Sequence, residues 1–139
     1  MANSSNSEPQ ENLVPIRSDA DIVTARQQGR ALAERLGFTG SDLTVIATAI
    51  SELGRNILKY AGSGEIFLGP TNTGSKHGLI VVARDEGPGI SDVALAMQDG
   101  YSTSNGLGLG LPGTRRLMDK FDIDSMVGRG TTVTVKKWL

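Results

Sequence analysis

The hydrophobic periodicity of the chain changes near residue 60, and this change constrains the fold more than any other feature. Up to that point, apolar residues recur every three or four positions, the spacing that places them on one face of an α-helix. Beyond it, apolar runs are short and bounded by glycine, as in β-strands. The chain therefore predicts a pair of helices followed mainly by strands.

Each of the two helices has boundary signals. Ser18 and Asp21 have the spacing of a capping box, which starts the first helix, and Gly37 is its expected end. The second helix is expected to begin near Ser41 and to end at the AGSG stretch, residues 61–64. The apolar positions with helical spacing are Ile22, Ala25, Gly29, Leu32 and Leu36 in the first helix and Leu43, Ile46, Ile50, Leu53 and Ile57 in the second.

The rest of the chain predicts strands, helices and glycine-rich turns. Residues 13–18 are expected to form an edge strand, because Pro15 cannot donate to a central ladder. The other expected elements are strands over 64–70 and 78–86 with a loop over 71–77 between them, a helix over 91–100, a glycine-rich segment over 101–111, a helix over 112–121, and strands over 122–127 and 131–138. This order predicts an α+β fold, a two-layer α/β sandwich with helices on one face of a mixed, mostly antiparallel sheet.

Length and composition narrow the class of protein. The 139 residues suit one domain, expected over 13–139 after a disordered tail over 1–12. The absence of cysteine excludes disulfides and cysteine-based zinc sites. A net charge of −1, from 14 basic and 15 acidic residues, argues against a surface for nucleic acid or for a membrane. With no long apolar run and no recognisable signal peptide, a cytoplasmic protein is expected.

Two polar residues of the second helix are candidate ligands. Glu52 and Asn56 are four residues apart, so they are neighbours on the helix surface. Carboxylate and carboxamide oxygens suit Mg²⁺, which also keeps waters and substrate phosphates. The same residues would equally suit an exposed polar face.

Asp85 ends an apolar strand and is followed by Gly87 and Gly89. An acid at this place commonly initiates a turn. The bare backbone would also admit a flat ligand, and a carboxylate there can accept a hydrogen bond from the exocyclic amine of adenine. Both interpretations remain open at this point.

The segment GLGLGLPG, from Gly106 to Gly113, leads into the helix expected over 112–121. Bare amides at a helix N-terminus can bind phosphate, and the polar residues 102–105 supply further donors. The segment lacks the P-loop pattern. A mobile hinge loop is the alternative.

In this order, the three motifs resemble the N, G1 and G2 boxes of the GHKL superfamily of ATP-binding proteins, whose members have the Bergerat fold. GRGTTVTV, residues 128–135, resembles the closing box. The stretches AISELGRNILKYAG, DEGPGI, GYSTSNGLGLGLPGTRRLMDKF and KKWL are most similar to serine/threonine kinases of the anti-sigma-factor type, in particular to the stressosome switch kinases. The resemblance runs from about residue 13 to the end.

The resemblance implies a role for each matched residue. Asn56 would bind Mg²⁺, Glu52 would act as general base on the attacking hydroxyl, and Asp85 would accept from the adenine amine. Arg55 and Lys59 would either assist with phosphate charge or be solvated. The further ATP-binding residues implied are Gly87, Gly89 and Ile90, which surround the base, Ser102, Thr103, Ser104, Gly106, Leu107, Gly108, Leu109 and Gly110, which belong to a lid over the phosphates, and Thr131, near the adenine.

The resemblance also implies partners. The substrates would be STAS-domain scaffold or antagonist proteins in a partner-switching stress pathway, and the released kinase would activate a PP2C-type phosphatase. The alternative is an ATP-binding anti-sigma factor that sequesters a sigma factor. A histidine kinase is disfavoured, because the chain has no dimerisation helix pair with a phosphoaccepting histidine and its one histidine, His77, falls in the expected 71–77 loop.

Overall fold

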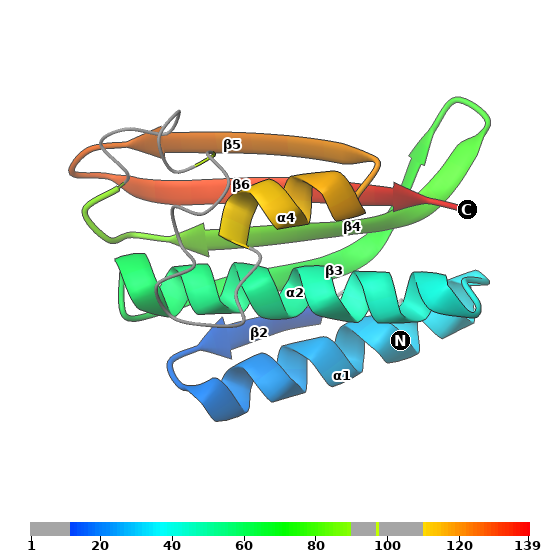
Figure 1. The fold of residues 1–139 in the computed structure, drawn as a ribbon, viewed down its shortest axis with the longest axis horizontal. Helices are drawn as coiled ribbons and strands as arrows, with labels where there is room; N and C mark the ends of the chain where they lie inside the picture. Colours follow the sequence, from blue (N-terminus) through cyan, green and yellow to red (C-terminus); the bar gives the residue numbers. More distant parts are fainter. Residues whose placement is uncertain (1–11, 90–96, 98–109) are drawn as a thin grey trace, which may run out of the picture.

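The computed structural model describes residues 12–89, 97 and 110–139 (Figure 1). Residues 1–11 of the expected tail over 1–12, the expected helix over 91–100 apart from residue 97, and most of the glycine-rich segment therefore lie outside the described residues. Asn12, which the sequence assigned to the tail, is the first residue of a strand. The elements in chain order are β2 (Asn12–Ile16), α1 (Asp19–Leu36), α2 (Ser41–Tyr60), β3 (Gly64–Thr73), β4 (Lys76–Asp85), α4 (Gly110–Leu117), β5 (Lys120–Met126) and β6 (Gly130–Trp138).

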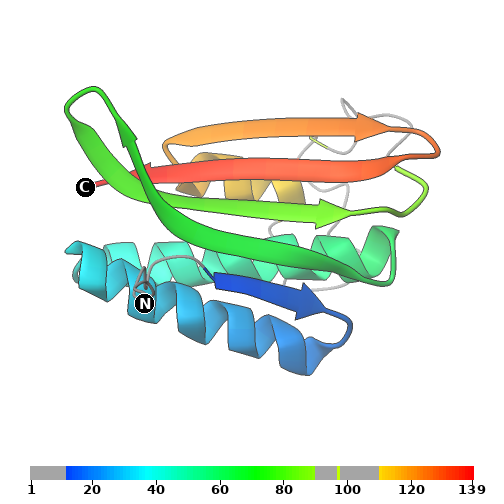
Figure 2. The same cartoon turned by 180° about the vertical axis from the view of Figure 1, so that it is seen from behind.

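One sheet contains the five described strands, in the order β2-β3-β4-β6-β5. All four neighbouring pairs are antiparallel, so the described sheet is antiparallel throughout and not mixed. The expected edge strand with Pro15 is confirmed as β2. The described helices cover one face of the sheet (Figure 1), and none of them lies on the other face, which Figure 2 shows. The two-layer α+β architecture is confirmed.

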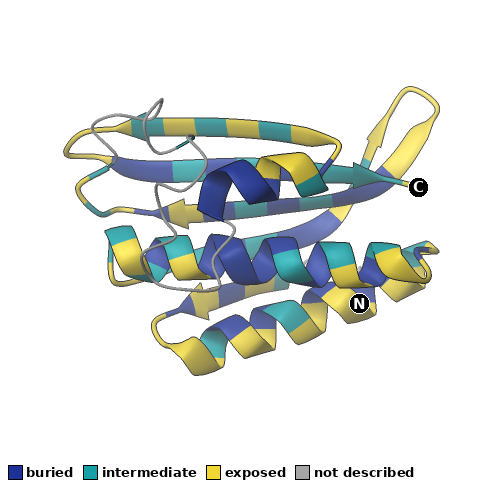
Figure 3. Cartoon of the chain, in the orientation of Figure 1, coloured by how far each residue is buried: buried dark blue, intermediate teal, exposed yellow. Residues whose placement is uncertain are grey.

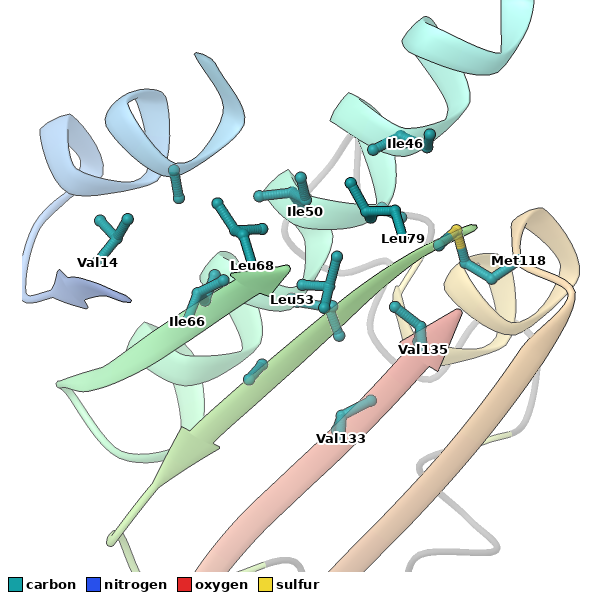
Figure 4. Close-up of a cluster of buried hydrophobic side chains, with 14 of the residues drawn as sticks. Val14, Ile46, Ile50, Leu53, Ile66, Leu68, Leu79, Met118, Val133 and Val135 are labelled. Carbon is teal, nitrogen blue, oxygen red and sulfur yellow. The ribbon is translucent and has the colours of Figure 1, made fainter. Parts of the chain in front are cut away.

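The helix α2 supplies the middle of the hydrophobic core. Its Ile46, Ile50 and Leu53 are fully buried and lie over inward-facing strand residues such as Leu68 and Leu79 (Figure 4). Figure 3 shows that α1, by contrast, is exposed along one side. Full burial of each of the three α2 side chains contributes about 1.5–3 kcal/mol to the free energy of unfolding. The apolar face of α2 is thereby fixed on the sheet, and the polar residues of α2 take their positions from it.

Close packing of α1 and α2 depends on two glycines. A Cβ atom added at Gly54 would lie 2.8 Å from Cγ1 of Ile22, and one at Gly29 would overlap Ile50. Any larger residue at either position would push the helices apart. Gly37 ends α1 with a φ of 111°, as predicted.

The start of α1 differs from the predicted capping box. Ser18 is the N-cap residue, but its side chain makes no capping hydrogen bond. Instead, the Asp21 carboxylate accepts hydrogen bonds from the backbone N–H of Arg17 at 2.8 Å and from the Ser18 hydroxyl at 3.4 Å. Asp21 thus satisfies a backbone donor one residue earlier than a capping box requires.

The β3–β4 hairpin is longer than predicted. Only Gly74 and Ser75 separate the two strands, and Gly74 has a φ of 59°, which a two-residue hairpin turn favours. His77 therefore lies in a strand and not in a loop, with its Nδ1 2.5 Å from Oδ1 of Asn72 on the opposite strand. The prediction of a loop over 71–77 was wrong because this end of the hairpin projects into solvent (Figure 3). Both of its faces are polar, so no alternation of apolar residues marks the strands.

The helix expected over 112–121 is shorter and begins earlier. It is α4, Gly110–Leu117, with Pro112 in its first turn as predicted. Phe121, expected to be helical, is paired with Val135 in the sheet and packs against the core. Burial of this side chain as part of β5 ends the helix before Phe121 is reached.

Candidate functional site

Glu52 and Asn56 lie one turn apart on α2, and they do not form an exposed polar face. Glu52 is buried, with Oε1 accepting a hydrogen bond from the backbone N–H of Gly110 at 3.2 Å and Oε2 in an ion pair with Arg55. Asn56 is half-buried, and its Nδ2 is buried with no hydrogen-bond partner among the described residues. An unsatisfied buried amide costs about 1–3 kcal/mol, so this atom marks a place where a ligand would be stabilising.

Asp85 is buried at the end of β4. Its Oδ1 accepts two backbone hydrogen bonds, from Gly87 at 2.9 Å and from Thr131 at 3.3 Å. The first of these is the turn initiation that the sequence suggested. Within the described part of the chain, no donor reaches Oδ2. One oxygen therefore supports the fold, while the other remains an acceptor for a ligand.

Thr131 lies directly opposite Asp85 in the register of β4 and β6. It is buried, and its hydroxyl oxygen lies 2.7 Å from that of Ser125 on β5. The closing motif of the sequence is thus beside the acid of the DEGPGI motif. Direct contact of Thr131 with adenine stays a prediction.

A narrow cavity joins the residues of α2 to those of the sheet. Asn56, Asp85 and Thr131 all line it, and its volume is about 10 Å³. The rest of the lining is mainly apolar: Leu53, Ile57, Tyr60, Ala83, Leu111 and Val133. Apolar walls with a few convergent polar groups are typical of ligand pockets. This volume holds about one water molecule, so the cavity would admit an adenine ring only if the lining side chains moved apart.

The two glycines after Asp85 border the chain itself. A Cβ atom at Gly87 would overlap Ala61 at the end of α2, and one at Gly89 would overlap the carbonyl oxygen of Met126. Gly89 also has a φ of 82°, which other residues rarely adopt. Both glycines are therefore required by the close approach of α2 and the β5–β6 turn. Their role in admitting a flat base stays a prediction.

Gly110 is the one residue of the predicted lid that the structure describes. It begins α4 with a φ of 66°, and its N–H donates to Glu52. Amides at a helix N-terminus bind anions, and here the anion is the Glu52 carboxylate. The other predicted residues of this region lie outside the described residues: Ile90, Ser102, Thr103, Ser104, Gly106, Leu107, Gly108 and Leu109.

Sequence reasoning missed three residues of the site. Arg55, considered only for phosphate charge or solvation, pairs with Glu52 at the i, i+3 spacing that favours such pairs on a helix. Tyr60 and Leu111 line the cavity, and no sequence signal pointed to them. Lys59 lies over the Tyr60 ring, 5.5 Å from its centroid.

The metal prediction rests on Asn56. In residues 12–89, 97 and 110–139, no group of three or more histidine, aspartate or glutamate side chains is arranged to hold a metal. A cation bound by one carboxamide, waters and substrate phosphates fits the chemistry of Mg²⁺ better than that of a metal with an all-protein cage. No helix in these ranges has the apolar length needed to cross a bilayer.

Residues 41–139 match the family described as "Histidine kinase-, DNA gyrase B-, and HSP90-like ATPase". The chain belongs to this ATPase family. The matched region begins at α2 and includes Glu52, Asn56, Asp85 and Thr131. Membership confirms the GHKL fold and the use of ATP.

Individual relatives cover most of the chain. It is 50% identical over 129 residues to "Serine/threonine-protein kinase RsbT" of Bacillus subtilis (strain 168), which is 93% of this chain and 97% of the relative. It is 32% identical to "Anti-sigma F factor" of Bacillus licheniformis over 122 residues, 83% of this chain and 82% of the relative. The protein of that name from Thermoanaerobacter sp. (strain X514) is 31% identical over 121 residues, 83% of each chain. The predicted serine/threonine kinase of the anti-sigma-factor type is confirmed.

Proposed function

We propose that this kinase transfers the γ-phosphoryl group of ATP to a serine or threonine of a STAS-domain scaffold or antagonist protein. The reaction would belong to a cytoplasmic partner-switching stress pathway of the stressosome type, and the released kinase would then activate a PP2C-type phosphatase. The observation that carries the proposal is the cavity lined, between apolar walls, by Asn56 with its orphaned amide and by the buried Asp85. The similarity to "Serine/threonine-protein kinase RsbT" supports a serine or threonine as the acceptor.

The nucleotide is oriented by residues at the two ends of the site. The adenine amine donates to Oδ2 of Asp85, since Oδ1 is held by the backbone N–H groups of Gly87 and Thr131. The apolar walls of the cavity, once apart, cover the faces of the base. The phosphates are bound toward the N–H of Gly110 and the preceding glycine-rich residues.

Asn56 would hold Mg²⁺ through its carboxamide oxygen, and the ion would neutralise phosphate charge. In the transfer step, the acceptor hydroxyl oxygen bonds to the γ-phosphorus, the bond from that phosphorus to the ADP oxygen breaks, and Glu52 takes the hydroxyl proton. Glu52 has both oxygens engaged, by Gly110 and Arg55. A phosphate oxygen competes for the Gly110 N–H, so nucleotide binding releases Oε1 for its role as base.

The test is phosphate transfer from radiolabelled ATP into a purified STAS-domain protein. Wild type should label the partner, and Glu52→Gln should slow labelling by about 10²-fold or more, the usual effect of losing a general base. ATP affinity, measured by calorimetry, should stay within a few-fold. Glu34→Gln, a change of an exposed acid on α1, is the matched control and should label normally. Labelling by Glu52→Gln at the wild-type rate would contradict the role of Glu52.

A second function is favoured by the relatives named anti-sigma F factor. In that case the protein would bind a sigma factor in the presence of ATP. Co-purification with a sigma factor, together with no labelling of any STAS-domain partner by an ATP-binding wild type, would replace the kinase–substrate assignment by this one.

A further inference from the structure

Arg55 has a position that neither of its sequence-based interpretations, phosphate contact or solvation, describes. Its guanidinium forms an ion pair with Oε2 of Glu52, one turn earlier on α2. The two side chains differ in exposure, with 51% of Arg55 and 4% of Glu52 accessible to solvent. An ion pair between two exposed groups contributes little, because water replaces either partner. Here the carboxylate is buried, so loss of Arg55 would leave a buried charge without its counter-ion.

The Glu52 carboxylate is held by two different elements, α2 and α4, which pack beside each other (Figure 1). Gly110, at the start of α4, donates its backbone N–H to Oε1 at 3.2 Å, and Arg55 binds Oε2. Among the described residues, no other group binds this carboxylate. The last side-chain torsion of a glutamate is otherwise broad. One contact on each oxygen therefore fixes the plane of the carboxylate.

Nucleotide binding would affect these two contacts differently. The N–H of Gly110 lies at a helix N-terminus, where a phosphate oxygen competes for it. Arg55 and Glu52 belong to the same helix, so a movement of α4 relative to α2 leaves their spacing unchanged. Once the Gly110 bond is lost, Arg55 is the one described group that still holds the carboxylate.

We propose that Arg55 is a positioning residue for phosphoryl transfer. It holds Oε2 of Glu52 while Oε1, released by the nucleotide, takes the proton of the acceptor hydroxyl as the acceptor oxygen replaces the ADP oxygen on the γ-phosphorus. This inference rests on the proposed role of Glu52 as general base. A base acts only within hydrogen-bond reach of the proton, so a carboxylate that rotates freely loses rate. The planar guanidinium of arginine fixes a carboxylate better than the point charge of lysine does.

This role differs from a contact with phosphate. An arginine bound to a phosphate oxygen would contribute to ATP affinity, and its effect on the rate would not depend on Glu52. A positioning residue acts through Glu52 alone. Its loss should therefore lower kcat without weakening ATP binding, and it should have no effect once Glu52 can no longer act as a base.

The first experiment measures phosphate transfer from radiolabelled ATP to a purified STAS-domain protein at saturating ATP. Arg55→Ala should lower kcat by about 10- to 100-fold, the usual effect of misplacing a catalytic group. Arg55→Lys should recover part of the rate. ATP affinity by calorimetry should stay within about threefold in both variants, which also shows that they are folded. Arg35→Ala, at an exposed position in the last turn of α1, is the control. Transfer at the wild-type rate by Arg55→Ala, or a tenfold loss of its ATP affinity, overturns the proposal.

A double-mutant comparison then tests whether Arg55 acts through Glu52. In a Glu52→Gln background, Arg55→Ala should slow transfer by no more than about twofold, because the base is already lost. An equal loss in both backgrounds would mean that Arg55 acts on the phosphates or on the partner, and the proposal fails. If wild type labels no STAS-domain protein, the proposed substrate is wrong, and hydrolysis of ATP by water replaces labelling as the measured reaction.

A spectroscopic measurement follows the ion pair without any turnover. In nitrogen-15 NMR of the full chain, Glu52→Gln should shift the Arg55 Nε–H resonance, because its partner has lost its charge. A non-hydrolysable ATP analogue with Mg²⁺ should shift the Gly110 amide resonance of wild type and leave the Arg55 signal in place. A shift of the Arg55 signal to its position in Glu52→Gln would show that the nucleotide breaks the pair. That result overturns the inference even if STAS-domain proteins are phosphorylated.

Discussion

At the scale of single residues, Asp85 contributes to the fold through one carboxylate oxygen and leaves the other for the proposed ligand. Oδ1 is held by the backbone N–H groups of Gly87 and Thr131, which join the end of β4 to β6. Oδ2 takes part in neither of these contacts, so it can accept a hydrogen bond from a ligand without disturbing them. The choice between turn residue and adenine acceptor, which the sequence left open, is therefore not exclusive.

Asp85→Asn separates the two roles. Asparagine keeps Oδ1 for the two backbone donors, so the fold should be retained, but it presents an NH₂ group where the adenine amine needs an acceptor. An unmatched donor costs about 1–3 kcal/mol, so ATP affinity measured by calorimetry should fall about tenfold or more. Asp122→Asn, a change of an exposed acid, serves as control. Unchanged affinity in a folded Asp85→Asn protein would remove Asp85 from the site.

At the scale of elements, the position of α2 decides the geometry of the site. This helix carries Glu52 and Asn56, and it is fixed by the core beneath it and by α1 beside it. One close approach of α1 is at Gly54, which lies between the two candidate site residues in the sequence. A change in the α1–α2 contact should therefore affect the free energy of unfolding more than the geometry of the site.

Gly54→Ala tests this contact. Helix propensity alone would make alanine more stable by about 1 kcal/mol. The added Cβ would lie 2.8 Å from Ile22, however, and overpacking typically costs about 1–3 kcal/mol. We expect the free energy of unfolding to fall by about 1 kcal/mol in urea denaturation. In an Ile22→Ala background the clash is gone, so the same change should be neutral or stabilising. An equal loss in both backgrounds would show that Ile22 is not the cause.

At the scale of the whole molecule, nucleotide binding and stability are linked. The candidate site joins α2 to β4 and β6, so a ligand bound there would stabilise contacts between the helical layer and the sheet. A ligand at 100 times its dissociation constant adds about 2.7 kcal/mol to the free energy of unfolding. Because the cavity is narrow, the free energy needed to open it reduces this gain.

Metal removal provides the matching prediction. ATP with Mg²⁺ should raise the melting temperature, and a chelator added to ATP should reduce that rise, because the phosphate charge is no longer neutralised. In Asn56→Ala the rise should be smaller and should respond little to the chelator. Mg²⁺ without ATP is the control and should leave the melting temperature unchanged. A full response to the chelator in Asn56→Ala would mean that another group binds the metal.

The sequence by itself determined the local structure and the motifs. Helical spacing of apolar residues located α1 and α2, and Gly37 ended α1 where a left-handed residue is needed, because these signals act within a few neighbouring residues. The spacing of Glu52 from Asn56 and the acid at the end of β4 were equally visible. The length of the β3–β4 hairpin could not be predicted from the sequence, because a strand with solvent on both sides has no hydrophobic periodicity.

Only the tertiary structure decided which polar groups are buried and what they contact. Glu52 could have been solvated, but the N–H of Gly110, 58 residues away in the chain, meets it at the start of α4. Likewise, Lys120 faces Lys136 only because β5 and β6 pair in one register. Such contacts join residues that are distant in sequence, so their energies depend on how the elements pack and leave no local pattern in the amino-acid order.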